Sequence, residues 1–444
     1  MTPRVPARPA WFAQRPVSPS LETFGADVVT PDAAGTWLVS RPLLWAGTEG
    51  RGRRPGPRPS SPPQRVCAPP APGLVRRLSE AGRARVRRQR SEGDPDLAVT
   101  GVRGTGKGVL GLLFKRCTLL LPTKDRLKYI HKILSEVSCF KFSGCSTPLQ
   151  CVGLPCYGIF LQTLTAGWDE LECQRVYNYL CELTNLSHKM QTVVCNKPGS
   201  SQKLELRIRL FCRNVLLDHW TQRSDFAFWL TRILKPWPMV NQARLLYIIF
   251  GPASPQDGQV IWQEMVEGPT DESSLKSLAN AIKLLYDTST KEWTADDVIS
   301  LVDELSVVPQ EWLLENNARL LILSGSNICF TFMASKAVNG RTIDLSRLIV
   351  FLALVCEKEL YCMDWTVRMM QKVCKVFNTA AERKSFLQSV ANAFACVTME
   401  ILQPIMSGER DDDDRGFLDL FHLLHAQANF HKEVLYLTMN ASSS

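Results

Sequence analysis

The chain has 444 residues, with 52 Lys and Arg against 43 Asp and Glu, and a formal net charge of +9. Residues 1–108 contain 18 of the basic residues, 8 of the acidic residues and 16 of the 27 prolines, whereas residues 109–444 have a net charge of −1. Positive charge spread over the whole chain would favour a nucleic-acid-binding protein. Because the excess positive charge is confined to the first quarter, net charge gives no reason to expect nucleic-acid binding by residues 109–444.

Residues 1–108 are predicted to form a disordered tail rich in Arg and Pro. No segment of the tail shows a helical or strand period long enough to bury one face. The densest basic run is Arg83–Arg90. We interpret this run as a solvated linker, with a nuclear-import signal or a phosphate-binding arm as the alternative. Contact with nucleic acid is therefore expected only weakly, and only through the tail.

The end of the tail resembles a phosphate-binding loop. The segment Gly101–Gly108 places Lys107 after three glycines, as a loop that cradles phosphates requires. The next position should carry a Ser or Thr hydroxyl for Mg²⁺, but it is Gly108. No convincing apolar strand ending in Asp follows. A nucleotide-dependent enzyme is therefore the less favoured hypothesis, and no cofactor is expected.

From residue 109 onward the hydrophobic pattern is helical, and we predict an all-α body over residues 109–444. Thr294 and Asp297 have the spacing of a capping box, which places a helix start between them. Pro309 is expected to open the next helix, where its missing N–H is harmless. The four acidic residues Asp411–Asp414 are expected to form a solvated loop.

An internal repetition suggests that this body is an α-solenoid. The segments Trp237–Leu246 and Trp312–Leu321 share six of ten residues at an offset of 75, and the dipeptide Trp-Thr recurs three times at offsets of 73 and 72. We predict repeats of about 72–75 residues around 205–400, each burying apolar faces against the next. Coincidence, with Thr as a common helix cap, is the alternative. The repeat-defining residues, expected to be structural, are Trp220, Thr221, Trp237, Trp293, Thr294, Trp312, Trp365, Thr366, Arg244 and Arg319.

Arg244 and Arg319 occupy equivalent positions of the repeated segments. Two interpretations are open: the arginines present a shared charge on the surface, or they form ion pairs within their repeats. We favour the ion pairs.

No catalytic constellation is found. His422, His425 and His431 are close in sequence, but they lack the His-Glu-x-x-His pattern of a zinc hydrolase. Four cysteines are spaced too widely for a structural zinc knuckle, namely Cys139, Cys145, Cys151 and Cys156. We therefore expect no enzyme activity, no metal and no cofactor.

The sequence also bears on the compartment. The longest uninterrupted apolar run, Leu348–Cys356, is shorter than the roughly 20 residues of a membrane span, so no membrane segment is expected. The N-terminus lacks the apolar core of a secretory signal, and its prolines disfavour an amphipathic targeting helix. We expect a nuclear or cytoplasmic protein with reduced thiols.

Several long segments resemble the F-box protein family. They are Leu110–Lys124, Leu161–Cys173, Leu204–Thr221 and Phe430–Met439. The resemblance extends from about Leu110 to the C-terminus with few gaps, which makes it far more specific than a short motif.

The resemblance implies a non-catalytic substrate receptor of a cullin-based ubiquitin ligase that binds protein targets through its helical body. It also implies a germ-line role in meiotic prophase, and a Skp-type adaptor and a cullin as partners. Family members begin with an F-box, a helical module that binds the adaptor and starts near a Leu-Pro-x-Glu-Ile/Leu pattern. Residues 1–108 contain no such pattern. The alternative is therefore a helical interaction scaffold that does not recruit the adaptor.

Overall fold

The structure, a computed structural model, describes residues 112–122, 125–126, 128–130, 132, 147–220, 222–288, 292–407 and 413–441. The predicted tail at 1–108, its basic run and its phosphate-loop-like segment lie outside these residues. Within them the chain is helical, and no strand forms beyond an isolated antiparallel bridge between Ala253 and Val260. The predicted all-α fold is confirmed.

The helices of the first half follow a short 3₁₀ turn at Pro148–Gln150. They are α4 (Gly153–Thr165), α5 (Glu170–Thr184), α6 (Leu186–Cys195), α7 (Gln202–Phe211), the π-helical segment Cys212–Leu217, α8 (Arg223–Leu234), α9 (Met239–Phe250), the short α10 (Glu264–Glu267) and α11 (Glu272–Asp287). Asp169 caps α5 by accepting the N–H of Glu172 at 2.7 Å, which satisfies one of the open donors of a helix start.

The second half contains longer helices. They are α12 (Ala295–Leu305), α13 (Leu314–Ser324), α14 (Ser326–Val338), α15 (Thr342–Lys358), α16 (Met363–Cys374), α17 (Ala380–Met406) and α18 (Asp413–Ala441). The predicted capping box at α12 is present: Thr294 accepts the N–H of Asp297, and the Asp297 carboxylate accepts the N–H of Thr294.

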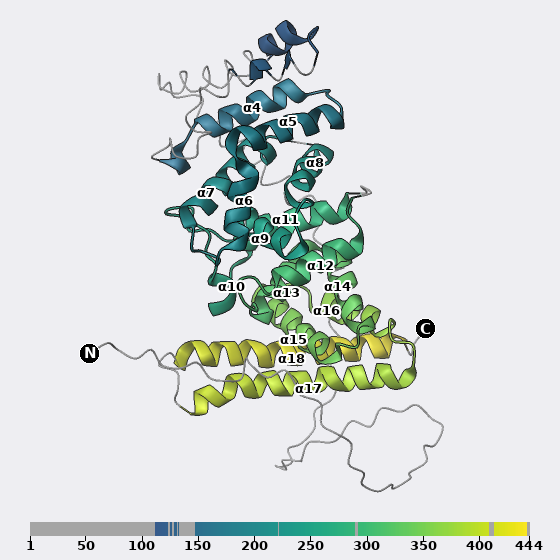
Figure 1. The fold of residues 1–444 in the computed structure, drawn as a ribbon. Helices are drawn as coiled ribbons and strands as arrows, with labels where there is room; N and C mark the ends of the chain where they lie inside the picture. The colour runs from purple at the N-terminus through teal and green to yellow at the C-terminus, as the bar shows by residue number, and fades with distance from the viewer. Residues whose placement is uncertain are drawn as a thin grey trace, which may run out of the picture. The chain divides into compact units, whose positions relative to one another are not determined.

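Each helix packs mainly against helices nearby in the chain, which is the arrangement of a solenoid (Figure 1). In one row α11 lies on α13, α13 on α15 and α15 on α17. In the other row α12 contacts α14, α14 contacts α16 and α16 contacts α18. The antiparallel hairpin of α17 and α18 forms the last layer, against α15 and α16.

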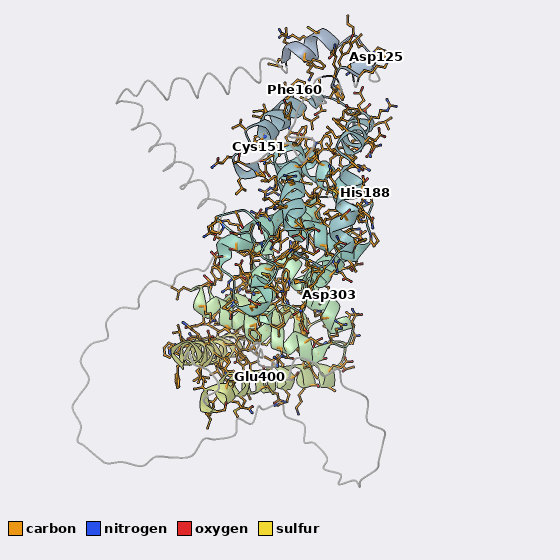
Figure 2. All side chains as sticks on the ribbon, turned by 60° about the vertical axis from the view of Figure 1, so that its left-hand side comes forward. Asp125, Cys151, Phe160, His188, Asp303 and Glu400 are labelled. Atoms are coloured by element: carbon orange, nitrogen blue, oxygen red, sulfur yellow. The ribbon has the colours of Figure 1, made fainter. Side chains whose placement is uncertain are left out.

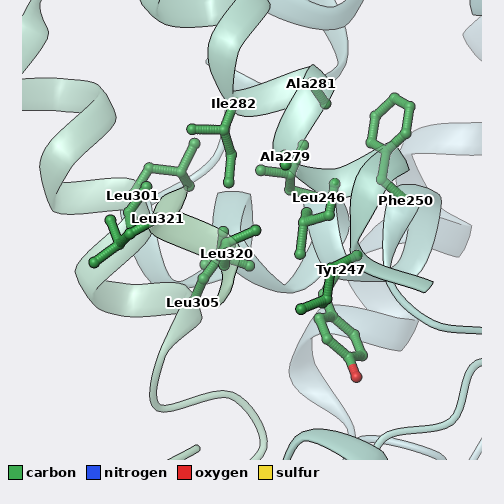
Figure 3. Close-up of a cluster of buried hydrophobic side chains, with 14 of the residues drawn as sticks. Leu246, Tyr247, Phe250, Ala279, Ala281, Ile282, Leu301, Leu305, Leu320 and Leu321 are labelled. Carbon is green, nitrogen blue, oxygen red and sulfur yellow. The ribbon is translucent and has the colours of Figure 1, made fainter. Parts of the chain in front are cut away.

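The core runs through the stack between these rows. Figure 3 shows a cluster of hydrophobic side chains from four helices, among them Leu246 and Phe250 of α9, Ile282 of α11, Leu301 of α12 and Leu320 of α13. All five side chains are buried. Because successive helices share one apolar seam, each helix depends on its neighbours for the burial that stabilises it.

Two local expectations need correction. Pro309 does not open a helix, because α13 begins only at Leu314. The chain turns at Pro309, where Trp312 donates from its backbone N–H to Ser306 and from its indole to Val308. Nor is the acidic run wholly a loop, because α18 begins at Asp413, while Asp411 and Asp412 lie outside the described residues.

One described helix, α17, is long and apolar enough to cross a membrane by length and composition alone. The expectation took account only of uninterrupted apolar runs, whereas the apolar residues of α17 are interrupted by polar ones. Packing also accounts for some of these apolar residues: α17 contacts α15 and α18, and 28% of the apolar stretch is buried inside the protein. The expected absence of a membrane segment remains an expectation.

Candidate protein-binding grooves

A groove opens between α5, α6 and the corner that joins α8 to α9. We call it the Trp237 groove, and its volume is about 560 Å³. Its lining residues are Gln174, Tyr177, Asn178, Cys181, Glu182, Ser187, Met190, Thr231, Arg232, Lys235, Pro236 and Trp237. Amides, charges and aromatic rings thus line one open groove, which suits a polypeptide better than a small apolar ligand.

The two cations of the Trp237 groove are held over aromatic rings. The Lys235 ammonium lies 4.3 Å from the Trp293 ring centroid and 3.2 Å from Asp297. The Arg232 guanidinium lies 5.1 Å from the Phe228 ring centroid, and it bonds Glu292 at 2.8 Å. These contacts restrict both long side chains in advance of binding, which lowers the entropy cost of using them as anchors.

Two polar atoms of this groove lack a hydrogen-bond partner within the protein. They are Oε1 of Gln174 and Nε of Arg232. The Gln174 amide already donates to Asn178 at 2.9 Å, so its carbonyl is the group left over. A buried acceptor and a buried donor without partners are what a bound peptide backbone, or ordered water, would satisfy.

The groove does not offer an activated nucleophile among its thiol and phenol groups. Burial raises the pKa of the Cys181 thiol, and it raises the pKa of Tyr177 well above its ordinary value. Both groups therefore remain protonated at neutral pH, whereas the reactive form of a nucleophile is the deprotonated one.

A second groove, the Lys336 groove, lies between α12 and α14 and has a volume of about 360 Å³. Its lining residues are Ile299, Ser300, Asp303, Phe332, Ser335, Lys336, Asn339 and Arg341. The Lys336 ammonium contacts Asp303 at 2.7 Å and lies 4.7 Å from the Phe332 ring centroid; Figure 2 labels Asp303 on the stack. The cation over an aromatic ring thus recurs in both grooves.

The residues predicted from the Trp-Thr pairs lie near the starts of three helices. Trp220 is half-buried before α8 and stacks on Trp229 at 5.6 Å, and Thr221 lies outside the described residues. Trp293 is buried before α12 and donates to Thr231 of α8 at 3.0 Å. Trp365 lies within the first turn of α16 and donates to Ser326 of α14 at 3.0 Å.

The threonines of these pairs differ in role. Thr294 caps α12, whereas Thr366 lies inside α16 and is buried against Cys356, with the Sγ and Oγ1 atoms 3.1 Å apart. The pairs therefore share a place at the start of a helix but not one register. The proposed period of 72–75 residues remains a prediction.

Trp237 and Trp312 occupy equivalent positions two residues before α9 and α13. Trp237 lines the groove, and its carbonyl accepts the Gln242 amide at 2.7 Å. Trp312 is buried, with its ring centroid 5.8 Å from that of Tyr247. Of the repeat-defining tryptophans, Trp237 lines a groove, and the buried Trp293 lies beneath the Lys235 ammonium of that groove.

The two equivalent arginines have different partners. Arg244 donates to the carbonyls of Val194 and Asn196 at the end of α6. Arg319 pairs with Glu315 in its own helix at 3.3 Å and with Glu359 after α15 at 2.9 Å. Arg319 thus forms an ion pair within its own helix. Arg244 instead donates to carbonyls at the end of α6, which have no partner within that helix.

Sequence reasoning did not identify Arg232, Lys235 or Lys336. Arg232 and Lys235 lie three residues apart on one helix face just before Trp237, and that pattern is a usable signal. Lys336 has no such local signal, since its partner Asp303 comes from another helix. Among the described residues no group of three or more His, Cys, Asp or Glu side chains could hold a metal ion.

Comparison with known proteins identifies the family. The family described as "FBXO47, ARM repeats" matches residues 182–411, which include both grooves except for the first residues of the Trp237 groove. The mouse protein named F-box only protein 47 is 90% identical over 335 residues, which are 76% of this chain and 74% of the mouse protein. The human protein of that name is 84% identical over 335 residues, with the same coverage.

No solved structure matches this chain. The identity to both mammalian proteins extends over three quarters of either chain, and the stacked helices agree with the repeat type that the family description names. The chain therefore belongs to the F-box only protein 47 family, and its helical body contains the ARM repeats of that family.

Proposed function

We propose that this chain is a non-catalytic substrate-recognition subunit of a cullin-based ubiquitin ligase and that it binds protein targets through its helical body. The observation that carries the proposal is the high identity to two proteins named as F-box proteins, over about three quarters of this chain. Such a receptor performs no chemistry itself, because its task is to hold a target near the ubiquitin-loading machinery.

The two grooves support target binding of a particular kind. Both contain a lysine held over an aromatic ring beside a carboxylate. Such side chains are pre-ordered and partly neutralised, so they favour a peptide that offers acceptors as well as apolar side chains over a purely acidic ligand. A target segment that follows the stack is the ligand that we propose.

Recruitment of the adaptor is a separate part of the proposal. About a quarter of each mammalian relative lies outside the match, and residues 1–108 of this chain lack the Leu-Pro-x-Glu-Ile/Leu pattern of an F-box. A scaffold that binds targets without the adaptor is the alternative. Affinity capture of the full chain, with the human relative as control, separates the two: a receptor recovers adaptor and cullin in proportion to bait, and a scaffold recovers neither.

Target binding has its own test. In Lys235→Met the side chain keeps its stem over Trp293 and loses its charge. We expect proteins captured by the full chain to be reduced at least severalfold by Lys235→Met, with adaptor recovery unchanged. Lys276→Met, which alters an exposed lysine of α11, is the matched control. Equal capture by both variants would show that the Trp237 groove does not bind targets.

We also propose a nuclear or cytoplasmic location and a role in meiotic protein turnover. The first is supported by the many thiols of the chain and the basic run of the tail, and the second by the family membership. Imaging of the tagged full chain in germ cells at meiotic prophase tests both, and exclusion from nucleus and cytoplasm would overturn the first.

A further inference from the structure

The last helix of the stack has an apolar stripe on the side that faces away from the protein. On the inner side of α18, Leu423, Ala426 and Phe430 are buried against the stack. On the opposite side, large apolar residues are exposed at successive spacings of four, three, eleven and four residues, which keep them on one face of a helix: Phe417, Phe421, Leu424, Leu435 and Met439. Their exposed fractions lie between 48% and 66%. We call these five residues, together with Ala428 and Lys432, the α18 stripe.

An apolar outer face is unusual at this place. Within the described residues no other helix covers this side of α18, and an uncovered face of a solenoid needs polar side chains to remain soluble. Figure 1 shows α18 with α17 beyond the rest of the stack. Among the residues of the stripe, Lys432 is the only charged side chain. An acidic or basic partner would therefore find little to pair with on this face.

The α18 stripe has an internal symmetry about Ala428. Phe417 and Met439 lie eleven residues to either side of it, and Phe421 and Leu435 lie seven residues to either side. In an antiparallel pair of identical helices that crosses at Ala428, Phe417 of one copy meets Met439 of the other and Phe421 meets Leu435. Leu424 meets Lys432, whose alkyl stem can cover it while the ammonium group reaches solvent. Ala428 meets itself at the centre, where a small side chain lets two helices approach to about 8–10 Å.

We propose that this chain forms a two-fold symmetric dimer through the α18 stripe, with two α18 helices packed antiparallel about Ala428. A two-fold interface uses the same patch on both copies, and the matched pairs at seven and eleven residues from Ala428 make the stripe self-complementary in that way.

The size and charge of the stripe are compatible with this partner. With the flanking Leu418 and Tyr436, which are also about half exposed, each copy offers apolar surface on the order of 600 Å². Two copies would then bury about 1,200 Å², which is the lower limit of specific interfaces. The two Lys432 ammonium groups would lie about 12 Å apart along the axis, because each is four residues from the centre.

Cross-linking tests the register. In the full chain with Ala428→Cys, the two new thiols meet at the axis, so we expect a disulfide-linked dimer under mild oxidation. In the control Thr438→Cys, the two thiols would be about 30 Å apart, so no dimer beyond that of the unmodified chain is expected. The unmodified chain controls for native exposed cysteines such as Cys396. Equal cross-linking of the two variants would overturn the antiparallel register.

Sedimentation velocity tests the dimer itself. We expect the mass of the full chain to double between low and high micromolar concentration, and Phe421→Glu and Leu435→Glu to remain monomeric with unchanged helicity. Leu171→Glu alters an equally exposed leucine of α5 and should still dimerise. A wild-type chain that is monomeric throughout, or a dimer that persists in both α18 variants, would overturn the proposal.

Discussion

At the scale of single residues, a few buried polar side chains join distant segments. Asn316 is fully buried at the third position of α13. It accepts the N–H of Thr270 at 2.8 Å and donates to the carbonyls of Met265 and Gly268 at 3.0 and 2.8 Å. One side chain thus satisfies backbone groups of α10 and of the loop that joins α10 to α11.

Asn316→Ala should destabilise the protein by about 2–3 kcal/mol, because it leaves buried backbone groups without partners. Asn241→Ala is the matched control, since Asn241 stands at the equivalent position of α9 but is only partly buried. Urea denaturation followed by circular dichroism measures the free energy of unfolding of both variants. Equal losses at the two positions would refute the role assigned to Asn316.

At the scale of elements, some helix starts depend on capping residues that can be recognised in the sequence. Thr294→Ala removes half of the capping box of α12 and should cost about 1 kcal/mol of stability. Thr342→Ala, at the first residue of α15, removes no capping bond and should be nearly neutral. Thermal unfolding of the two variants tests this, and a similar shift in Tm for both would contradict it.

The same cap predicts a dependence on pH. The backbone N–H of Thr294 and the Lys235 ammonium hold the pKa of Asp297 below its ordinary value. Because the pKa is lower in the folded than in the unfolded chain, the cap stabilises the fold above about pH 3.9 and loses this effect as the pH falls through the folded pKa. Urea titrations at neutral pH and below about pH 4 should show a smaller acid loss for Asp297→Asn than for the wild type. An identical acid loss would contradict the prediction.

At the scale of the whole molecule, an ion-pair network connects the last layers of the stack. Lys358 at the end of α15 contacts Glu315 of α13 at 3.0 Å and Asp419 of α18 at 2.9 Å. Arg347 of the same helix pairs with Glu400 of α17, which Figure 2 labels, through two bonds of 2.6 and 2.8 Å. The terminal hairpin is thus fixed to α15 by charge as well as by apolar contact.

Lys358→Met should weaken the C-terminal layers more than the rest, because a solenoid couples each layer mainly to its neighbours. Burial raises the pKa of the thiols of Cys212 and Cys329, and that of Cys356 to about 11, so the three are protonated and shielded in the folded chain. Pulsed thiol labelling at rising urea should show earlier labelling of Cys329 and Cys356 in the variant, with Cys212 unchanged. A common shift of all three would instead indicate one cooperative unit.

The repeated segments show how far sequence reasoning extends into the candidate site. The shared residues of Trp237–Leu246 and Trp312–Leu321 correspond to two helices with similar starts, so the repetition predicted local structure well. It did not predict that Trp237 would line a groove while Trp312 is buried. That difference arises from the surroundings of each ring: Trp237 shares an open groove with residues of α5 and α6, whereas Trp312 packs beside Tyr247.

The sequence alone determined the helical class, the solenoid-like stacking and the cap of α12, because hydrophobic period and capping chemistry are local properties. Only the tertiary structure decided which charges meet: Lys336 with Asp303, Lys358 with Glu315 and Asp419, and Arg319 with Glu359. Those pairs join residues 33 to 61 positions apart. Such distances in sequence leave no periodic signal, since the partners are brought together by the packing of whole helices.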